Sequence, residues 1–149
     1  MQFVAESHIA CTPERLFAFH ELPDALSRLT PSFEKSRILQ VAPSLQPGAR
    51  AIVEVRIAPF VWIHTEAVHT LYDPPHLFID ELARGPFPRW RHRHEVAPDG
   101  DGARLRDAIE FEPPFGFIGR LLAPLIILPR LRRLFAYRHE VTRRWCVGE

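Results

Sequence analysis

The chain has 149 residues, the length of one average domain, and 46% of them are hydrophobic, enough for a buried core. Nineteen Lys and Arg residues nearly balance eighteen Asp and Glu residues, so no overall charge demands nucleic acid or an anionic membrane as partner. Cys11 and Cys146 lack metal-binding spacing, and the N-terminus lacks the charged start and apolar run of a signal peptide. We therefore expect a single reduced, cytoplasmic domain over residues 1–149.

The first thirty residues predict one strand followed by two short helices. Alternation of side chains over residues 2–10 indicates a strand. The Thr-Pro-Glu sequence at 12–14 supplies an N-cap, a favourable first helical residue and an acid in the first turn of a helix that reaches His20. A second helix begins at Pro23 and ends before Pro31, because a residue preceding proline avoids helical dihedral angles.

Six further strands follow, separated by turns rich in Pro, Gly and Asp. Short turns between successive strands favour antiparallel pairing, and the Asp-Gly-Asp-Gly turn at 99–102 is the clearest hairpin. The expected strands are 33–41, 51–57, 60–71, 76–84, 87–96 and 103–112.

The last third of the chain predicts one long helix over residues 116–146. Pro124 and Pro129 inside it each remove a backbone donor and predict a bend or a break. The order of elements predicts an α+β fold, in which a curved antiparallel sheet of about seven strands wraps around this helix. The apolar residues that recur at steps of three, four and six are Leu121, Leu125, Leu128, Leu131, Phe135 and Val141.

Ionisable side chains are expected among apolar ones on the inner face of the sheet. Because side chains alternate along a strand, three neighbouring strands present a mixed set on one face. That set is Phe78, Asp80, Trp90, His92, His94, Asp107 and Ile109.

Three interpretations of the two carboxylates and two imidazoles remain open. They satisfy one another as a structural polar network, since an isolated buried charge is costly. Alternatively, they bind the polar end of a ligand in a cavity. As a third option, His92, His94 and an aspartate form a facial triad for Zn²⁺ or Fe²⁺. No third histidine or cysteine has matching spacing, so we expect no metal and no cofactor.

Five short segments carry a family resemblance that spans nearly the whole chain: Phe19–His20, Leu29–Pro31, Gly85–Phe87, Trp90–His94 and Phe135–His139. With them, the chain resembles the START-like, or SRPBCC, superfamily, and most of all its polyketide cyclase/dehydrase-like members. The resemblance implies a helix-grip fold, with a hydrophobic cavity between the sheet and the C-terminal helix. It transfers no catalytic motif to this sequence.

The main hypothesis for function is binding of a small hydrophobic or amphipathic molecule in that cavity, as a carrier or sensor. The alternative is a polyketide cyclase or dehydratase in which His92 or His94, with Asp107, transfers protons. The residues expected to bind the ligand are Phe78, Asp80, Trp90, His92, His94, Asp107 and Ile109 on the sheet and Leu121, Leu125 and Leu128 on the helix.

A third alternative is a membrane-associated accessory factor. The last helix is rich in arginine, which indicates either a solvated face or a basic surface that docks peripherally on anionic membranes. Nucleic-acid binding is not expected, because the aromatic residues fall at core positions rather than among the arginines. We expect a monomer or a homodimer. The arginines are Arg120, Arg130, Arg132, Arg133, Arg138, Arg143 and Arg144.

Overall fold

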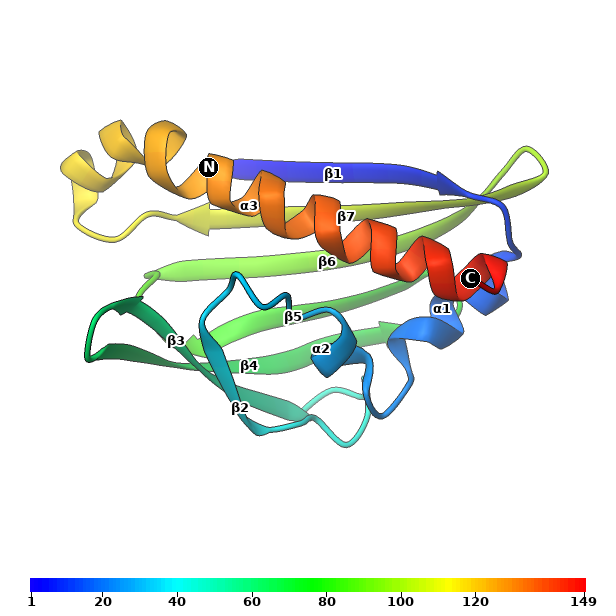
Figure 1. The fold of residues 1–149 in the computed structure, drawn as a ribbon, viewed down its shortest axis with the longest axis horizontal. Coiled ribbons are helices and arrows are strands. Elements are labelled where there is room, and N and C mark those ends of the chain that lie inside the picture. Colours follow the sequence, from blue (N-terminus) through cyan, green and yellow to red (C-terminus); the bar gives the residue numbers. More distant parts are fainter.

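The computed structural model describes residues 1–149 and contains a seven-stranded antiparallel sheet and three helices (Figure 1). The strand order is β1-β7-β6-β5-β4-β3-β2, so β1 and β2 are the edges of the sheet. The predicted helix-grip architecture is confirmed. In chain order the elements are β1 (Gln2–Ile9), α1 (Pro13–His20), α2 (Ala25–Arg28), β2 (Ser36–Gln40), β3 (Arg50–Ala58), β4 (Val61–Asp73), β5 (Leu77–Arg84), β6 (Arg89–Asp99), β7 (Gly102–Glu112) and α3 (Gly116–Val147).

Local sequence explains where the first elements begin and end. The Thr12 hydroxyl accepts a hydrogen bond from the Arg15 amide at 3.2 Å and caps α1, as the sequence predicts. Strand β2 is shorter than the expected 33–41, because Pro31 opens a turn in which the Glu34 amide donates to the Pro31 carbonyl at 3.1 Å. The 99–102 hairpin forms as predicted, with Asp99 opposite Gly102.

Two apolar clusters fill the space between the sheet and the helices. The first packs α1 against one end of the sheet and includes Leu16, Phe19 and Leu105. The second packs α3 against β1 and β7 and includes Phe3 and Phe135. The middle of β5, β6 and β7 lies between these clusters, and there the inner face of the sheet is polar.

The buried face of α3 differs from the expected one. Leu121 and Leu125 were expected to face the sheet, but they are 64% and 74% exposed. Residues Gly119 and Ala123 are buried instead, and each leucine lies two positions, about 200° around the helix, from one of them. The expected phase is therefore wrong for the first turns. The buried residues of α3 are Gly119, Ala123, Leu131, Phe135, His139, Thr142 and Cys146.

Helix α3 is unbroken from Gly116 to Val147, so the break considered at Pro124 and Pro129 does not occur. Its first turns lie at an angle to the rest of the helix and extend past the end of the sheet (Figure 1). Glycine is required at 119, because a Cβ atom there would lie 1.6 Å from the Pro114 carbonyl oxygen. The start of α3 is thus held close against the loop that leads into it.

Candidate functional site

The register of β5, β6 and β7 brings the four ionisable residues together on the concave face. Asp80 lies opposite His92, and His94 lies opposite Asp107. Phe78 lies opposite His94, and their rings stack with centroids 3.9 Å apart and an interplanar angle of 8°. Strand pairing alone therefore assembles a polar cluster with an aromatic wall.

Asp107 is the centre of this cluster. Its Oδ1 accepts hydrogen bonds from His92 Nε2 at 2.8 Å and from His94 Nδ1 at 3.0 Å. Its Oδ2 accepts from His139 Nε2 at 2.8 Å. One buried carboxylate thus orients three imidazole rings, two from β6 and one from α3.

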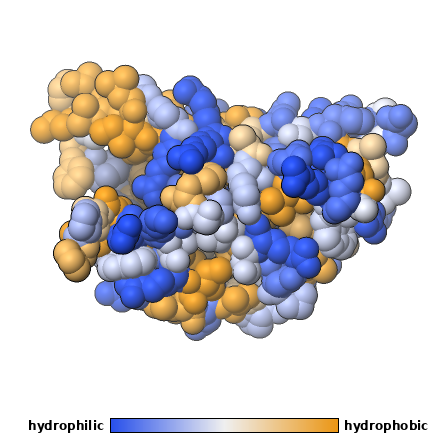
Figure 2. Space-filling model, viewed as in Figure 1, coloured by the Kyte–Doolittle hydropathy of each residue, from blue (hydrophilic) through white to orange (hydrophobic).

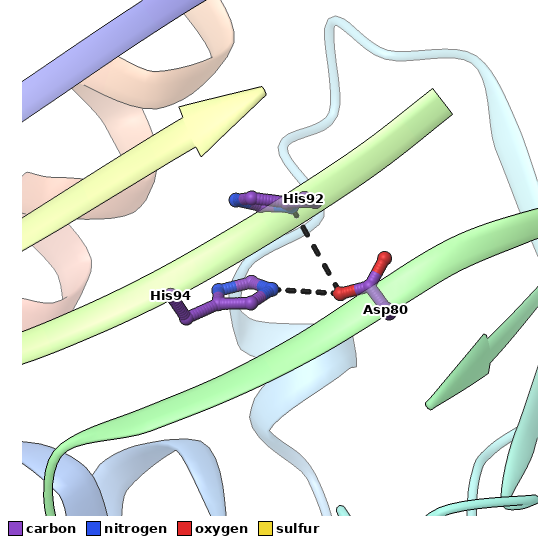
Figure 3. Close-up of side chains that lie close together, drawn as sticks. All are labelled: Asp80, His92 and His94. Carbon is purple, nitrogen blue, oxygen red and sulfur yellow. Dashed lines mark hydrogen bonds and ion pairs between the residues drawn. The ribbon is translucent and has the colours of Figure 1, made fainter. Parts of the chain in front are cut away.

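Asp80 binds the other side of His94 (Figure 3). The distance from His94 Nε2 to Asp80 Oδ2 is 2.7 Å, and His92 Nδ1 lies 4.0 Å from the same oxygen. Both ring nitrogens of His94 therefore face carboxylates, an arrangement in which both donate only when the ring is protonated. The geometry assigns His94 as an imidazolium between two aspartates.

The pKa values of these groups follow from burial and from these hydrogen bonds. Burial lowers the pKa of His94, but the bonds to Asp107 and Asp80 outweigh it and raise the pKa to about 9. Burial raises the pKa of Asp80, but the bond from His94 outweighs it and lowers the pKa to about 2. Burial opposes ionisation of Asp107 as well, yet the bonds from His139, His92 and His94 hold its pKa well below the usual range.

Of the neighbouring imidazoles, those of His92 and His20 are neutral at pH 7. Burial and the positive charge of His94 lower the pKa of His92, and the same causes lower that of His20 to about 4. Because His92 Nε2 donates to Asp107, its lone pair is on Nδ1. The His92 and His94 rings, with centroids 3.7 Å apart, are thus a neutral base beside a charged acid.

Asp80, His92 and His94 are also the residues that could hold a metal ion, since one ligand atom from each lies within 4.8 Å of the others. Two imidazoles and a carboxylate suit Zn²⁺ or Fe²⁺. An ion would have to displace the His94 proton and the hydrogen bond between His94 and Asp80. These side chains already satisfy one another through hydrogen bonds and ion pairs, as the structural interpretation expects, and the charge of His94 offsets one of the two carboxylate charges.

Sequence reasoning missed His139 and Ser7 as members of this cluster. The Ser7 hydroxyl and His139 Nδ1 are hydrogen-bonded at 2.7 Å, which extends the chain of hydrogen bonds from Asp107 to β1. The signal was present: His139 follows Leu131 and Phe135 at steps of four, and Ser7 alternates with the inward Phe3 and Ile9. The neutral imidazole of His69, opposite Asp80 on β4, was missed as well.

The residues expected to form apolar walls fall into two groups. Phe78 and Ile109 are buried, and Trp90 packs against Phe111 with ring centroids 5.7 Å apart. Leu128 is half-buried against the second apolar cluster, whereas Leu121 and Leu125 face solvent and cannot line an interior site. The helix contributes Phe135 and His139 in their place.

The enclosed space at the cluster is small. A cavity of about 20 Å³ lies among His20, His92, His94, Asp107 and His139, room for about one water molecule. A larger groove of about 680 Å³ runs outside, between the free edge of β1 and α3, and has a charged rim that includes Arg132, Glu140 and Arg143. Only Ser7 and His139 of the polar cluster reach that open groove, so the concave interior is the candidate site.

Residues 28–34 include Leu29, which lines the small cavity, and are tied to α3 by polar contacts. Arg138 Nε donates to the Leu29 carbonyl at 3.1 Å. The Arg130 guanidinium binds both carboxylate oxygens of Glu34, at 3.0 and 2.6 Å. We call these residues the closing segment.

Residues 1–136 match the protein family described as "Polyketide cyclase / dehydrase and lipid transport". The chain belongs to this family. Membership agrees with the resemblance drawn from the sequence and with the helix-grip fold of the START-like superfamily. No curated protein matches the sequence.

Solved structures share this fold at low sequence identity. Norcoclaurine synthase of Thalictrum flavum, solved as a point mutant with a transition-state analogue, has a TM-score of 0.76 and 16% identity, over 99% of this chain and 94% of that one. Protein CV1439 of Chromobacterium violaceum has a TM-score of 0.73 and 14% identity, over 98% and 97%. TTHA0849 of Thermus thermophilus has a TM-score of 0.68 and 20% identity, over 95% and 97%. These similarities establish the fold.

Proposed function

We propose that this protein binds a small amphipathic molecule on the concave face of the sheet, with the polar end of the molecule at Asp80, His94 and Asp107. The observation that carries the proposal is the buried charged cluster itself, placed between two apolar clusters. Ligand sites are mostly apolar and contain a few convergent polar groups, and the concave face has this composition.

The hydrocarbon part of the ligand would lie along β3, β4 and β5, which α3 leaves uncovered (Figure 1). The register pairs Ala67 with Leu82 and His69 with Asp80, so these side chains share the face of the cluster. They are half-buried, and so partly open to a ligand. The apolar and neutral residues of this face are Ala51, Val53, Ile63, Thr65, Ala67 and Leu82.

Two polar atoms on the same face support the proposal. His69 Nδ1 and Ser36 Oγ are buried side-chain atoms without a hydrogen-bond partner. A buried polar group without a partner costs about 1–3 kcal/mol. A ligand that bonds to either atom would recover that cost.

A tryptophan at position 67 tests the proposal by filling this face. We expect Ala67→Trp to weaken binding of 1-anilinonaphthalene-8-sulfonate, an apolar probe with an anionic group, by about tenfold or more. Fluorescence titration measures the affinity. Val68→Trp is the matched control, because Val68 is the next residue of β4 and points to the opposite face. Absence of probe binding to the wild-type protein, or equal weakening by both variants, would contradict the proposal.

One observation favours a second function, a dehydratase or cyclase. His94 is charged at neutral pH and His92 is neutral, so one can donate a proton while Nδ1 of the other accepts one. In a dehydration, His92 would take the proton next to the carbonyl group, and His94 would protonate the departing hydroxyl group.

A β-hydroxyacyl thioester tests this second function, with water loss followed by absorbance. We expect His92→Gln to lower kcat by about 10²-fold or more, the usual contribution of a general base. His64→Gln is the control, because His64 pairs with Glu66 away from the cluster, at 3.0 Å. Equal rates for the His92 variant and the wild-type protein would refute this role for His92, and so would absence of turnover by both.

A further inference from the structure

Large apolar side chains are exposed at one end of the molecule. The first turns of α3 and the loop between β3 and β4 both extend past this end of the sheet (Figure 1). Figure 2 shows the hydrophobic surface over the start of α3. We call this surface the apolar end; its main residues are Phe60, Phe115, Phe117, Ile118, Leu121 and Leu125.

Two of these phenylalanines have a backbone conformation that favours glycine. Phe60 has φ 63° and is 99% exposed, and Phe115 has φ 65° and is 85% exposed. A positive φ is uncommon for a bulky residue, and such strain persists mainly where function requires it. Folding gains nothing from a strained aromatic side chain in water, so a contact outside the folded chain accounts for it better.

At the start of α3, small residues face the protein and large apolar residues face solvent. Gly119 and Ala123 pack inward, while Phe117, Leu121 and Leu125 point away from the protein. Arg120 is the only charged residue between 113 and 129. No helix of this structure is long and apolar enough to cross a membrane. This stretch is therefore suited to lie in an interface rather than to span a bilayer.

Unpaired arginines surround the apolar end. Arg56 at the end of β3, Arg84 at the end of β5 and Arg120 on α3 are exposed and form no ion pair. Of the two acids at the end of β7, Glu110 pairs with Arg89 at 3.8 Å, and Glu112 alone is unpaired. The surroundings of the apolar end are thus positive.

We propose that the apolar end docks on the surface of an anionic lipid bilayer. Phe60, Phe117 and Leu125 insert among the acyl chains, and the arginines contact lipid phosphates. A second copy of the chain is a poorer occupant, because a two-fold contact through this surface brings the arginines of both copies together. The proposal does not rest on ligand binding or catalysis at the concave site.

Vesicle flotation tests the docking. We expect the protein to bind vesicles of phosphatidylglycerol and phosphatidylcholine, more weakly as salt is raised, and to bind pure phosphatidylcholine far less. The variant Phe60→Ser/Phe117→Ser/Leu125→Ser should bind at least about tenfold more weakly, because three apolar side chains no longer insert. All three residues are exposed, so the fold should be unaffected, and circular dichroism checks this.

A control variant removes three exposed apolar side chains elsewhere, Leu39→Ser/Val41→Ser/Leu71→Ser. It should bind vesicles as the wild-type protein does. Arg56→Gln/Arg120→Gln should reduce the salt dependence of binding.

Three results would overturn the proposal. The first is no binding to anionic vesicles at low ionic strength. The second is equal weakening in the apolar-end variant and the control. The third is a wild-type dimer in light scattering that the apolar-end variant dissociates, since the surface would then be an interface between two copies.

Discussion

Asp107→Asn is expected to lower the free energy of unfolding by about 3–5 kcal/mol, the usual cost of removing one partner from a buried ion pair. Asp107 accepts hydrogen bonds from three imidazoles, and its charge balances that of His94. An asparagine of the same shape carries no charge and places N–H groups against rings that already donate. Urea denaturation at pH 7 measures the loss.

The matched control is Glu66→Gln. Glu66 also accepts from a histidine, with His64 Nε2 at 3.0 Å, but both side chains are partly exposed. Solvent-exposed ion pairs contribute little to stability, so this variant should differ little from the wild-type protein. A loss below about 1 kcal/mol in Asp107→Asn would mean that the cluster is open to water and that its charges are not coupled.

The stability of the wild-type protein is expected to fall as the pH rises from about 7.5 to 8.5. The pKa of His94 is raised from an ordinary value near 6.5 to about 9 in the folded protein. Below about pH 6.5 both states bind the proton and the stabilisation is complete; above it the unfolded state loses the proton first. At about 1.4 kcal/mol per pH unit, the loss from pH 7.5 to 8.5 is roughly 1 kcal/mol.

Other titratable groups do not account for this decrease of stability with pH. The pKa values of His20, His69 and His92 are lowered in the folded protein, and in the unfolded chain these residues are largely neutral above about pH 7.5, so they add little to the change from pH 7.5 to 8.5. Burial raises the pKa of Cys146 to about 12, which lowers stability only at higher pH. His94→Gln should flatten the slope, whereas His64→Gln should keep it. A wild-type stability that is constant from pH 7.5 to 8.5 would refute the imidazolium assignment.

Strand alternation is the reason that four members of the polar cluster could be predicted from the sequence. Side chains on a strand have two orientations only, so Trp90 and Val96 fixed the direction of His92 and His94. The antiparallel register then set Asp80 and Asp107 beside them. Ligand binding or catalysis by these residues stays a prediction.

The phase of α3 could not be obtained in the same way. Residues 121–128 are apolar at almost every position, so a buried stripe can be drawn through them in several phases. The actual phase depends on Gly119, which allows the helix to approach Pro114 closely. The size of the interior cavity was equally out of reach, because it depends on how side chains such as Phe135 and Arg138 pack.

The closing segment affects the rates at which a ligand would bind and dissociate. Its ties to α3 are polar and aromatic: Arg130 and Arg138 make hydrogen bonds, and Phe33 packs edge-on against Tyr137. Opening the segment separates one aromatic pair, and salt weakens the ion pair between Arg130 and the half-buried Glu34. For a molecule held at the cluster, residence time would then be limited by opening of the segment, and it would shorten as ionic strength increases even where equilibrium affinity changes little.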